Sequence, residues 1–283
     1  MSTDDHICRV CKEHVSNNND ILVPEMMYGS GVKFAYFECP RCGTLQIVSI
    51  PDDLGQYYGK DYYSYNNEIP FNDRSTDGTD DRAVLDVGCG SGRFLIKLYN
   101  SGMTNLTGCD PFVPQDIDYD GKIKIHKKTI HEMDGKYDLI YLIDSFEHVT
   151  DPHEVMESLN RLLSDDGTIT ITIPVYPNVA YDEFGVFWYQ LDAPRHIHLF
   201  SESAMAYLAQ QHGLEAVGVE YDSNYGQFTH SFLYENGYSF YEQTQHVYDS
   251  FFTEEDLATM ERISKDANEK RRGDHAKFFI KHA

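Results

Sequence analysis

A glycine-rich turn is the chemically most informative segment of this sequence. In VLDVGCGSGRFL an apolar run leads to Asp86, and Gly88, Gly90 and Gly92 follow closely. Glycine allows a tight turn and a close approach of the backbone to a ligand, and the N–H groups at the start of a following helix can bind polar atoms. The spacing is G-x-G-x-G, whereas dinucleotide sites typically use G-x-G-x-x-G to hold a pyrophosphate. The turn therefore favours a cofactor without phosphate, such as S-adenosylmethionine (SAM).

A carboxylate at the end of the next apolar run supports this interpretation. The run LTGC leads into Asp110, eighteen residues after Gly92. A carboxylate at this place can accept hydrogen bonds from both hydroxyls of a ribose. An NAD-dependent oxidoreductase on the same fold is the competing enzyme class, and the glycine spacing argues against it.

Four of the six cysteines form two C-x-x-C pairs. The pairs are Cys8 with Cys11 and Cys39 with Cys42. Each pair can present two thiolates from one tight turn, and two pairs complete a tetrahedral zinc site without an open position, which makes the zinc structural. Reduced thiols or disulfides are the alternative, and the lack of a recognisable secretory signal favours metal ligands. His6 and His14 are spare candidate ligands.

Two histidines are the candidates for a catalytic base. His196, in APRHIHLFS, lies in a segment that we expect to open onto the carboxyl end of the sheet, where ligands bind. His148, in FEHV, is the second candidate. A loop histidine held for structure is the alternative for His196. Arg195 beside it can clamp a carboxylate or phosphate of the substrate.

The elements that must position these residues alternate between strands and helices. We predict short strands at AVLDVG, LTGCD, KIKIHKK, YDLIYLI and TITITIP, and helical spacing in GRFLIKLYNSG and PHEVMESLNRLL. Repeated β-α-β units give a mostly parallel sheet. Asp151 and Ser201 are predicted helix caps, and Gly213 ends the helix that Ser201 begins. Trp188 and its aromatic neighbours either stack on a sugar ring or fill a local core.

Composition divides the chain and limits its partners. Residues 1–50 form a zinc-binding module, residues 51–80 a tyrosine-rich connector or lid, and residues 81–283 the α/β domain, with an insertion at 175–200 and a helical stretch at 226–270. The net charge of -23 disfavours nucleic acids and anionic membranes as partners. No apolar run approaches the roughly 18 residues of a membrane span. We therefore expect a soluble, cytoplasmic protein, and the oligomeric state stays open.

From about residue 80 to its end, the chain resembles the class I SAM-dependent methyltransferases. The resemblance is carried by the glycine turn, Asp110, YDLIYLIDSFEHVTDP and LLSDDGTITITIP. It implies a Rossmann-like sheet of seven mostly parallel strands. More narrowly, YYGKDYYSY, DAPRHIHLFS, YDSNYGQF and RRGDHAKFFI are similar to a bacterial subgroup associated with surface-polysaccharide and small-molecule biosynthesis. A zinc ribbon also precedes some sugar C-methyltransferases.

The resemblance also implies roles for particular residues. The glycine turn with Asp86 would hold the methionine part of SAM. Asp110 and Pro111 would contact the ribose, Thr129 and Ile130 the adenine, and Asp144 and Ser145 would lie at the mouth of the site. Apart from the resemblance, Tyr58, Tyr62 and Tyr63 are candidates for a lid over the methionine end of SAM, and an aromatic cluster that packs the connector onto the main domain is the alternative. Related deoxysugar C-methyltransferases have a similar H-x-x-x-F-S motif whose histidine base follows a glutamate, and Arg195 replaces that acid here.

Together these features predict SAM-dependent methylation of a small hydroxylated acceptor. A sugar or sugar nucleotide in glycan biosynthesis is the specific expectation, and another small metabolite is the alternative. A third hypothesis is a SAM-sensing protein whose zinc ribbon recruits a partner. The sequence leaves open whether oxygen, nitrogen or carbon is methylated.

Overall fold

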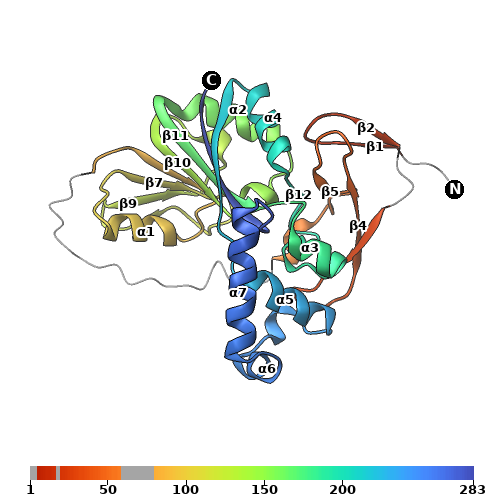
Figure 1. Cartoon of the computed structure of the whole chain (residues 1–283). Helices are drawn as coiled ribbons and strands as arrows, with labels where there is room; N and C mark the ends of the chain where they lie inside the picture. The colour runs from red at the N-terminus through yellow and green to blue at the C-terminus, as the bar shows by residue number, and fades with distance from the viewer. Residues whose placement is uncertain (1–4, 17–19, 59–79) are drawn as a thin grey trace.

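A central sheet of eight strands is the framework of the molecule (Figure 1). The structure is a computed structural model that describes residues 5–16, 20–58 and 80–283. Four neighbouring strand pairs, from β11 across to β9, are parallel, while β14 runs antiparallel to both of its neighbours. The predicted mostly parallel α/β sheet is therefore confirmed. Across the sheet the order is β13 (Leu214–Tyr221), β14 (His275–His282), β11 (Leu163–Pro174), β10 (Tyr137–Ile143), β6 (Val84–Val87), β7 (Leu106–Cys109), β9 (Ile123–His126) and β8 (Ile117–Asp118).

The predicted number of seven strands is wrong by one short strand. β8 pairs antiparallel with β9 at the edge of the sheet. Asp120 and Gly121 between the two strands have φ angles of 53° and 73°. An Asp-Gly pair with two positive φ angles makes the tight turn that joins antiparallel strands, so the chain folds back before β9 begins.

Two helices begin where the sequence predicts. α2 (Pro152–Leu162) has Asp151 as its N-cap, and the Asp151 carboxylate accepts hydrogen bonds from two N–H groups of the first turn. α4 (Glu202–Gln211) begins after Ser201, whose hydroxyl accepts a hydrogen bond in the same way. Gly213, with a φ of 70°, follows the end of α4. α2 and α4 contact each other, and they also contact β11 and β13, respectively.

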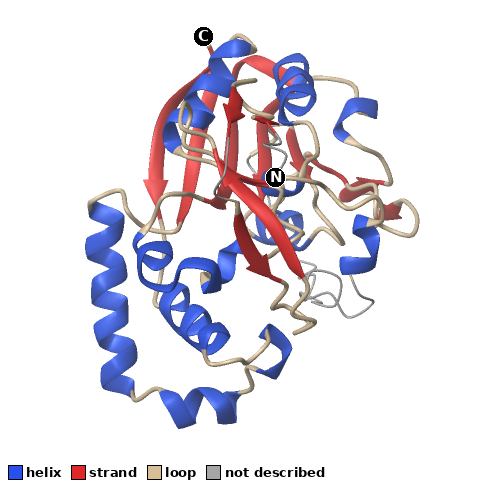
Figure 2. Cartoon of the chain, turned by 90° about the vertical axis from the view of Figure 1, so that its right-hand side faces the viewer, coloured by secondary structure: helices blue, strands red, loops and turns tan. Residues whose placement is uncertain are grey.

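The C-terminal helices extend away from the sheet (Figures 1 and 2). They are α5 (Gly226–Glu235), α6 (Gln245–Phe251) and α7 (Glu254–Glu269). α3 (Val179–Phe184) contacts α5, whereas α1 (Arg93–Asn100) contacts β7 and β9. Within the described part of the chain, no helix is both long enough and apolar enough to cross a membrane.

The N-terminal strands form two small sheets. β1 (Asp5–Ile7) and β2 (His14–Ser16) pair with each other. β3 (Ile21–Pro24), β4 (Lys33–Glu38) and β5 (Leu45–Ile47) form the second sheet, and a fourth strand, β12 (His198–Leu199), joins it from the segment after β11. β12 pairs antiparallel with β5. The N-terminal region therefore shares a sheet with the segment that contains His196.

A common hydrophobic core reinforces this joint between the N-terminal strands and the segment that contains His196. Tyr36, Leu45 and Ile47 of the N-terminal strands belong to the same buried cluster as Trp188 and Leu191. The Trp188 side chain is 1% exposed, and its indole N–H donates a hydrogen bond to a carboxylate from the far end of the chain. Trp188 thus fills a core, and of its two expected roles the stacking on a sugar ring is wrong.

A buried arginine also links the two regions. The guanidinium of Arg195, which is 0% exposed, donates hydrogen bonds to Asp192 at 2.8 and 2.5 Å and to Glu25 at 3.1 Å. A further bond of 3.0 Å reaches the carbonyl oxygen of Tyr57. Burial by itself would lower the pKa of Arg195. The effect of the two carboxylates is larger and raises this pKa above its usual value, so the side chain stays charged. The expected clamp on a substrate is therefore wrong, because Arg195 binds carboxylates of its own chain.

Replacing this arginine should weaken the whole fold. Arg195→Met leaves Asp192 and Glu25 buried without a cation, which we expect to lower the free energy of unfolding by about 3–5 kcal/mol. Urea denaturation measures the change. Arg271→Met is the matched control, because Arg271 pairs with Glu202 on the surface, where such a pair contributes at most about 1 kcal/mol. Equal losses in the two variants would contradict the role given to Arg195.

Candidate functional site

The glycine turn connects β6 to α1 at the carboxyl end of the parallel strands. Gly88, Gly90 and Gly92 have φ angles of 73°, 52° and 86°. A Cβ atom on Gly88 would lie 2.7 Å from the Cβ of Ser145, and one on Gly92 would lie 2.6 Å from Cδ1 of Ile125. Both the backbone conformation and the crowding therefore require glycine.

The two predicted aspartates lie at this turn. Asp110, at the end of β7 and 7% exposed, accepts hydrogen bonds from the N–H groups of Gly90 at 2.9 Å and Phe112 at 2.8 Å. Asp86 is 2% exposed, and burial together with the charge of Asp110 raises the pKa of its carboxyl to about 8. The structure thus brings the second-strand carboxylate onto the glycine turn, as expected from the sequence.

The residues after β10 border the same turn. Ser145 donates a hydrogen bond of 3.0 Å to the carbonyl oxygen of Val87. Asp144, with a φ of 48°, lies 2.9 Å from Nε2 of His275, whose Nδ1 lies 2.6 Å from Asp222. Burial lowers the pKa of His275, but the hydrogen bonds to these two carboxylates raise it to about 10. This imidazole is therefore a cation that fixes the loop after β10 to β14.

The other expected cofactor residues are less clearly assembled. Thr129 caps a short 3-10 helix that begins at Ile130, whose side chain is 5% exposed. Pro111 lies on the surface next to Asp110. Tyr62 and Tyr63, which the lid hypothesis concerns, lie outside the described residues.

A cleft of about 570 Å³ adjoins the glycine turn. Tyr58 and Phe112 stack across it with ring centroids 6.4 Å apart, and Phe112 is 74% exposed. The size and the aromatic lining suit a flat ring such as a nucleobase. The lining residues are Gly55, Tyr58, Ser91, Phe112, Val113, Pro114 and Ile117.

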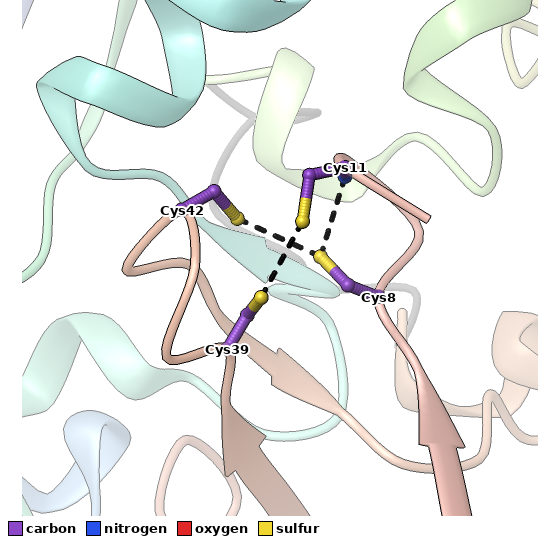
Figure 3. A group of neighbouring side chains, drawn as sticks. All are labelled: Cys8, Cys11, Cys39 and Cys42. Carbon is purple, nitrogen blue, oxygen red and sulfur yellow. Dashed lines mark hydrogen bonds between the residues drawn. The ribbon is translucent and has the colours of Figure 1, made fainter. Parts of the chain in front are cut away.

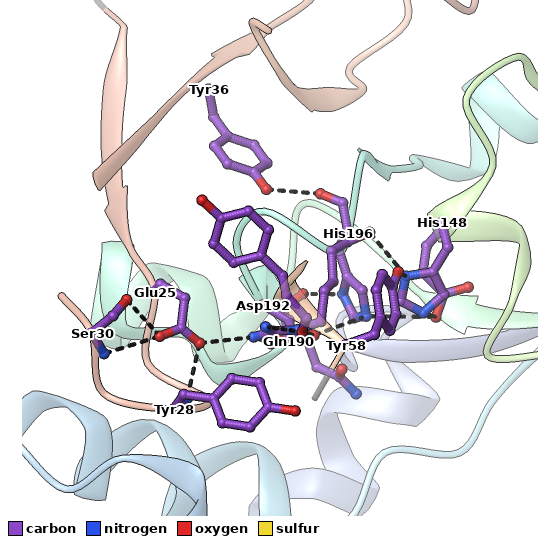
Figure 4. A network of polar contacts seen from close by, with 12 residues as sticks. Glu25, Tyr28, Ser30, Tyr36, Tyr58, His148, Gln190, Asp192 and His196 are labelled. Atoms are coloured by element: carbon purple, nitrogen blue, oxygen red, sulfur yellow. Dashed lines mark hydrogen bonds and ion pairs between the residues drawn. The ribbon is translucent and has the colours of Figure 1, made fainter. Parts of the chain in front are cut away.

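The two histidines proposed from the sequence lie side by side, with ring centroids 4.8 Å apart (Figure 4). Nδ1 of His148 lies 2.9 Å from the carbonyl oxygen of Arg195, and Nδ1 of His196 lies 2.7 Å from the carbonyl oxygen of Gln190. Because a carbonyl only accepts, both Nδ1 atoms carry the proton. In the neutral rings Nε2 is then the nitrogen with the lone pair.

Glu147 completes this group. Its Oε1 atom lies 3.8 Å from Nε2 of His196 and 4.0 Å from Nε2 of His148. Burial raises the pKa of the Glu147 carboxyl well above its usual range, lowers the pKa of His148 to about 4, and lowers that of His196. The imidazoles are therefore neutral near pH 7 and able to accept a proton or bind a cation.

Contacts from distant segments hold His196 in place. The Tyr36 hydroxyl, on β4, donates a hydrogen bond of 2.8 Å to the carbonyl oxygen of His196. The N–H of Ile197 donates one of 2.8 Å to the carbonyl oxygen of Glu147. Sequence reasoning missed the partners Tyr36, Glu147 and His275, because no local pattern signals which distant residues will meet.

The four paired cysteines form a compact buried cluster (Figure 3). Sγ of Cys8 lies 3.6 Å from Sγ of Cys42, Sγ of Cys11 lies 3.5 Å from Sγ of Cys39, and all four sulfurs lie within 4.8 Å of one another. These distances exclude disulfides in the structure. The four thiols are therefore placed to hold one metal ion.

Neighbouring groups orient these sulfurs. The amide of Gln46 donates to Sγ of Cys8 at 3.1 Å, and the hydrogen bond with Cys42 lowers the pKa of Cys8 to about 4. The hydroxyl of Ser201, at the start of α4, donates to the carbonyl oxygen of Cys42 at 2.6 Å. His6, a spare candidate ligand, instead lies 2.8 Å from a carboxylate oxygen of Asp20.

Comparison with known proteins gives a family match. A family model described as "Methyltransferase domain" matches residues 66–219, which is more than half of the chain. A solved structure of the complex between the Haloferax volcanii Trm112 methyltransferase activator and a methyltransferase superposes with a TM-score of 0.50 and 18% identity. That likeness covers 74% of this chain and 85% of the other, and it concerns the fold.

Curated relatives share only part of their length with this chain. A tRNA U34 carboxymethyltransferase of Helicobacter pylori (strain Shi470) is 27% identical over 104 residues, which are 32% of this chain and 40% of that protein. A ubiquinone biosynthesis O-methyltransferase of Glaesserella parasuis serovar 5 (strain SH0165) is 29% identical over 115 residues, 34% of this chain and 47% of that protein. The chain thus spans less than half the length of these two relatives.

A side chain on the glycine turn should be costly. Gly88→Ala introduces a methyl group that meets Ser145, and we expect crowding to lower the free energy of unfolding by about 1–3 kcal/mol beyond the backbone strain. Gly121→Ala is the matched control, because Gly121 has the same φ of 73° but no atom within 4 Å of the added carbon. Thermal and urea unfolding of both variants measure the difference. Equal destabilisation would show that crowding against Ser145 has no effect.

Proposed function

Because the chain belongs to the methyltransferase domain family, as the match over residues 66–219 shows, we propose that it transfers the methyl group of SAM to a small hydroxylated acceptor. The expectation of a SAM-dependent methyltransferase is thereby confirmed at the level of the family. The single observation that carries the proposed cofactor site is the contact of Asp110 with Gly90, which places a carboxylate directly on the glycine turn.

The geometry around the turn supports a particular placement of SAM. The Asp110 carboxylate would accept hydrogen bonds from the ribose hydroxyls, and the cleft beside Phe112 would take the adenine. Asp86 and the glycines would border the methionine part, and Ser145 would lie near the methyl group. Thr129 and Ile130 remain proposed contacts to the adenine, and Asp144 a residue at the mouth of the site.

The chemical step requires a nucleophile in line with the carbon–sulfur bond. The acceptor oxygen attacks the methyl carbon, the bond from that carbon to sulfur breaks with its electron pair going to sulfur, and the acceptor proton passes to a base. His196 and His148 are proposed for that base because each keeps a lone pair on Nε2. The products are the methylated acceptor and S-adenosylhomocysteine.

Charge favours a small acceptor. The curated relatives are named for tRNA and for ubiquinone biosynthesis. A chain with a net charge of -23 repels a polyanion such as tRNA, whereas a small hydroxylated molecule escapes most of this penalty. Within that class we propose a sugar or sugar nucleotide of polysaccharide biosynthesis, with another small metabolite as the alternative.

We also propose that the cysteine cluster holds a structural zinc ion. Four bonds of about 2.3 Å from zinc to sulfur place the sulfurs about 3.8 Å apart in a tetrahedron. The Sγ–Sγ separations of 3.5 Å between Cys11 and Cys39 and 3.6 Å between Cys8 and Cys42 are near this value, and all four cysteines are buried. Zinc would fix the two turns and supply no chemistry. Through Cys42 and Ser201 it would also support the start of α4.

Cofactor binding should depend on the two aspartates. Asp110→Ala removes the ribose acceptor, and Asp86→Asn changes the buried carboxyl beneath the turn. We expect each variant to bind SAM at least about tenfold more weakly by calorimetry, because a buried polar group left without its partner costs about 1–3 kcal/mol. Asp166→Ala, on the surface, is the control and should bind normally. Unchanged affinity in both site variants would overturn the assignment.

The unchanged chain is used to test which class of acceptor is methylated. Formation of S-adenosylhomocysteine is measured with nucleotide sugars, other small hydroxylated metabolites and tRNA. Turnover with a nucleotide sugar supports the specific proposal, and turnover with tRNA alone contradicts the charge argument. SAM binding without turnover on any of them would favour a SAM-sensing protein.

Metal removal should weaken the N-terminal region. We expect elemental analysis to find one zinc ion fewer per chain in Cys8→Ser than in the unchanged chain, together with a lower melting temperature, because the metal stabilises only the folded state. Cys89→Ser, outside the cluster, should keep the zinc. A zinc content that is the same in both variants would contradict the site.

A further inference from the structure

We propose that Glu147, His148 and His196 form a second metal site, which binds a divalent transition-metal ion at the acceptor end of the catalytic site. The proposal rests on the function proposed above and deepens it, because the ion would bind the hydroxyl group that receives the methyl group. With the ion bound, His148 and His196 would use their Nε2 lone pairs as ligands and would no longer serve as the base. The ligands of this second site differ in chemistry from the four cysteines, so an experiment can distinguish the two metal sites.

The three ligand atoms converge on one point. One ring nitrogen of His148, one of His196 and a carboxylate oxygen of Glu147 all lie within 4.8 Å of one another. Bonds of about 2.1 Å at the angles of tetrahedral or octahedral coordination place neighbouring ligands about 3.0–3.4 Å apart. The measured carboxylate-to-nitrogen distances are 3.8 and 4.0 Å, so a bound ion would draw the side chains inward by less than about 1 Å.

Both imidazoles already have the tautomer that a metal requires. The carbonyl oxygens of Gln190 and Arg195 accept hydrogen bonds from the Nδ1–H groups, which leaves the Nε2 lone pairs directed to the metal side. A hydrogen bond from the remote nitrogen to a carbonyl is the usual support of a metal-binding histidine, since it fixes the orientation of the ring. The hydroxyl oxygen of Tyr58, 3.2 Å from Nδ1 of His148, is a second acceptor for the same proton.

The carboxylate provides the independent observation. Glu147 is 1% exposed, and neither of its carboxylate oxygens has a hydrogen-bond partner among the described residues. A buried carboxylate without partners is costly, and buried acids are normally paired or bound to metals. The neighbouring acid Asp192 differs, because Arg195 already binds both of its oxygens. A cation between Glu147 and the two histidines would therefore satisfy the group that the fold leaves unpaired.

The ligand set indicates the kind of ion. Two imidazole nitrogens and one carboxylate suit zinc, manganese or iron(II), whereas magnesium and calcium prefer oxygen ligands. Three protein ligands leave coordination positions open for a substrate, unlike the closed set of four cysteines. His148 has a side-chain exposure of 19%, which leaves the group accessible from one side.

An ion here would act on the acceptor. A hydroxyl group bound to the ion becomes more acidic and releases its proton to water, and its oxygen then attacks the methyl carbon of SAM. The carbon–sulfur bond breaks and its electron pair stays on sulfur, giving a methyl ether, S-adenosylhomocysteine and one proton. Glu147 lies two residues after Ser145, which borders the glycine turn, so the ion would lie near the expected methyl group.

Manganese(II) is the probe that tests this site, because thiolates do not select it. The full chain, with its cysteine site as purified, is titrated with manganese chloride while electron paramagnetic resonance measures the free ion. Salt is kept high, since an acidic surface binds cations loosely and salt screens that attraction. We expect one manganese per chain, and at least about tenfold weaker binding in Glu147→Gln and in His148→Gln.

His282→Gln is the matched control, because His282 lies at the end of β14 and contacts the carbonyl oxygen of Leu163. It should bind manganese like the unchanged chain. Glu147→Gln keeps the size of the side chain and removes the carboxylate that would bind the ion, so it tests the site even if the histidine variant fails to fold. Saturable binding that is lost in the site variants alone supports the proposal, and no binding, or binding unaffected by Glu147→Gln, overturns it.

SAM calorimetry on the same samples separates the two proposals. SAM binding without manganese binding overturns the metal site and leaves the methyltransferase function standing. Manganese binding without SAM binding would overturn the proposed function and leave the metal site standing.

Discussion

The buried ion cluster of Arg195 with Asp192 and Glu25 is the interaction on which the arrangement of the site depends. Charges without exposed surface stay folded only when each one is paired, so the three residues hold one another in place. Glu25 follows β3, whereas Asp192 and Arg195 lie just before β12. The cluster therefore binds the N-terminal strands to the segment that contains His196, and the pairing of β5 with β12 continues the same joint.

This joint explains how the N-terminal strands contribute to the proposed site. Tyr36 holds the backbone of His196, and the carbonyl oxygen of Arg195 holds the ring of His148. At the turn between β4 and β5, the cysteine cluster is tied through Cys42 to Ser201 and the start of α4. The N-terminal strands, together with the segment that they hold, thus help to orient His148 and His196.

The central sheet supplies the other half of the site. Because β6, β7 and β10 are parallel, their carboxyl ends meet at one edge, and this brings the glycine turn, Asp110 and Ser145 together. The glycines allow close packing there, since a side chain on Gly88 would collide with Ser145. The charged His275, bound by Asp144 and Asp222, fixes the loop that follows β10. The proposed cofactor end and the proposed acceptor end of the site therefore belong to two structural units that meet along the loop from Asp144 to His148.

The sequence by itself determined the features that depend on near neighbours. Local residue chemistry and periodicity account for the glycine turn, the C-x-x-C turns, the helix caps at Asp151 and Ser201, and the parallel sheet. The Asp-Gly turn that adds β8 was not predicted. Only the tertiary structure decided that Arg195 pairs with Glu25, 170 residues away, and that Tyr36 holds His196 across 160 residues. It also decided that Glu147 is buried near two histidines, with no hydrogen bond to its carboxylate from the described residues. Such contacts depend on how the whole chain packs, and no local pattern encodes which distant charges will meet.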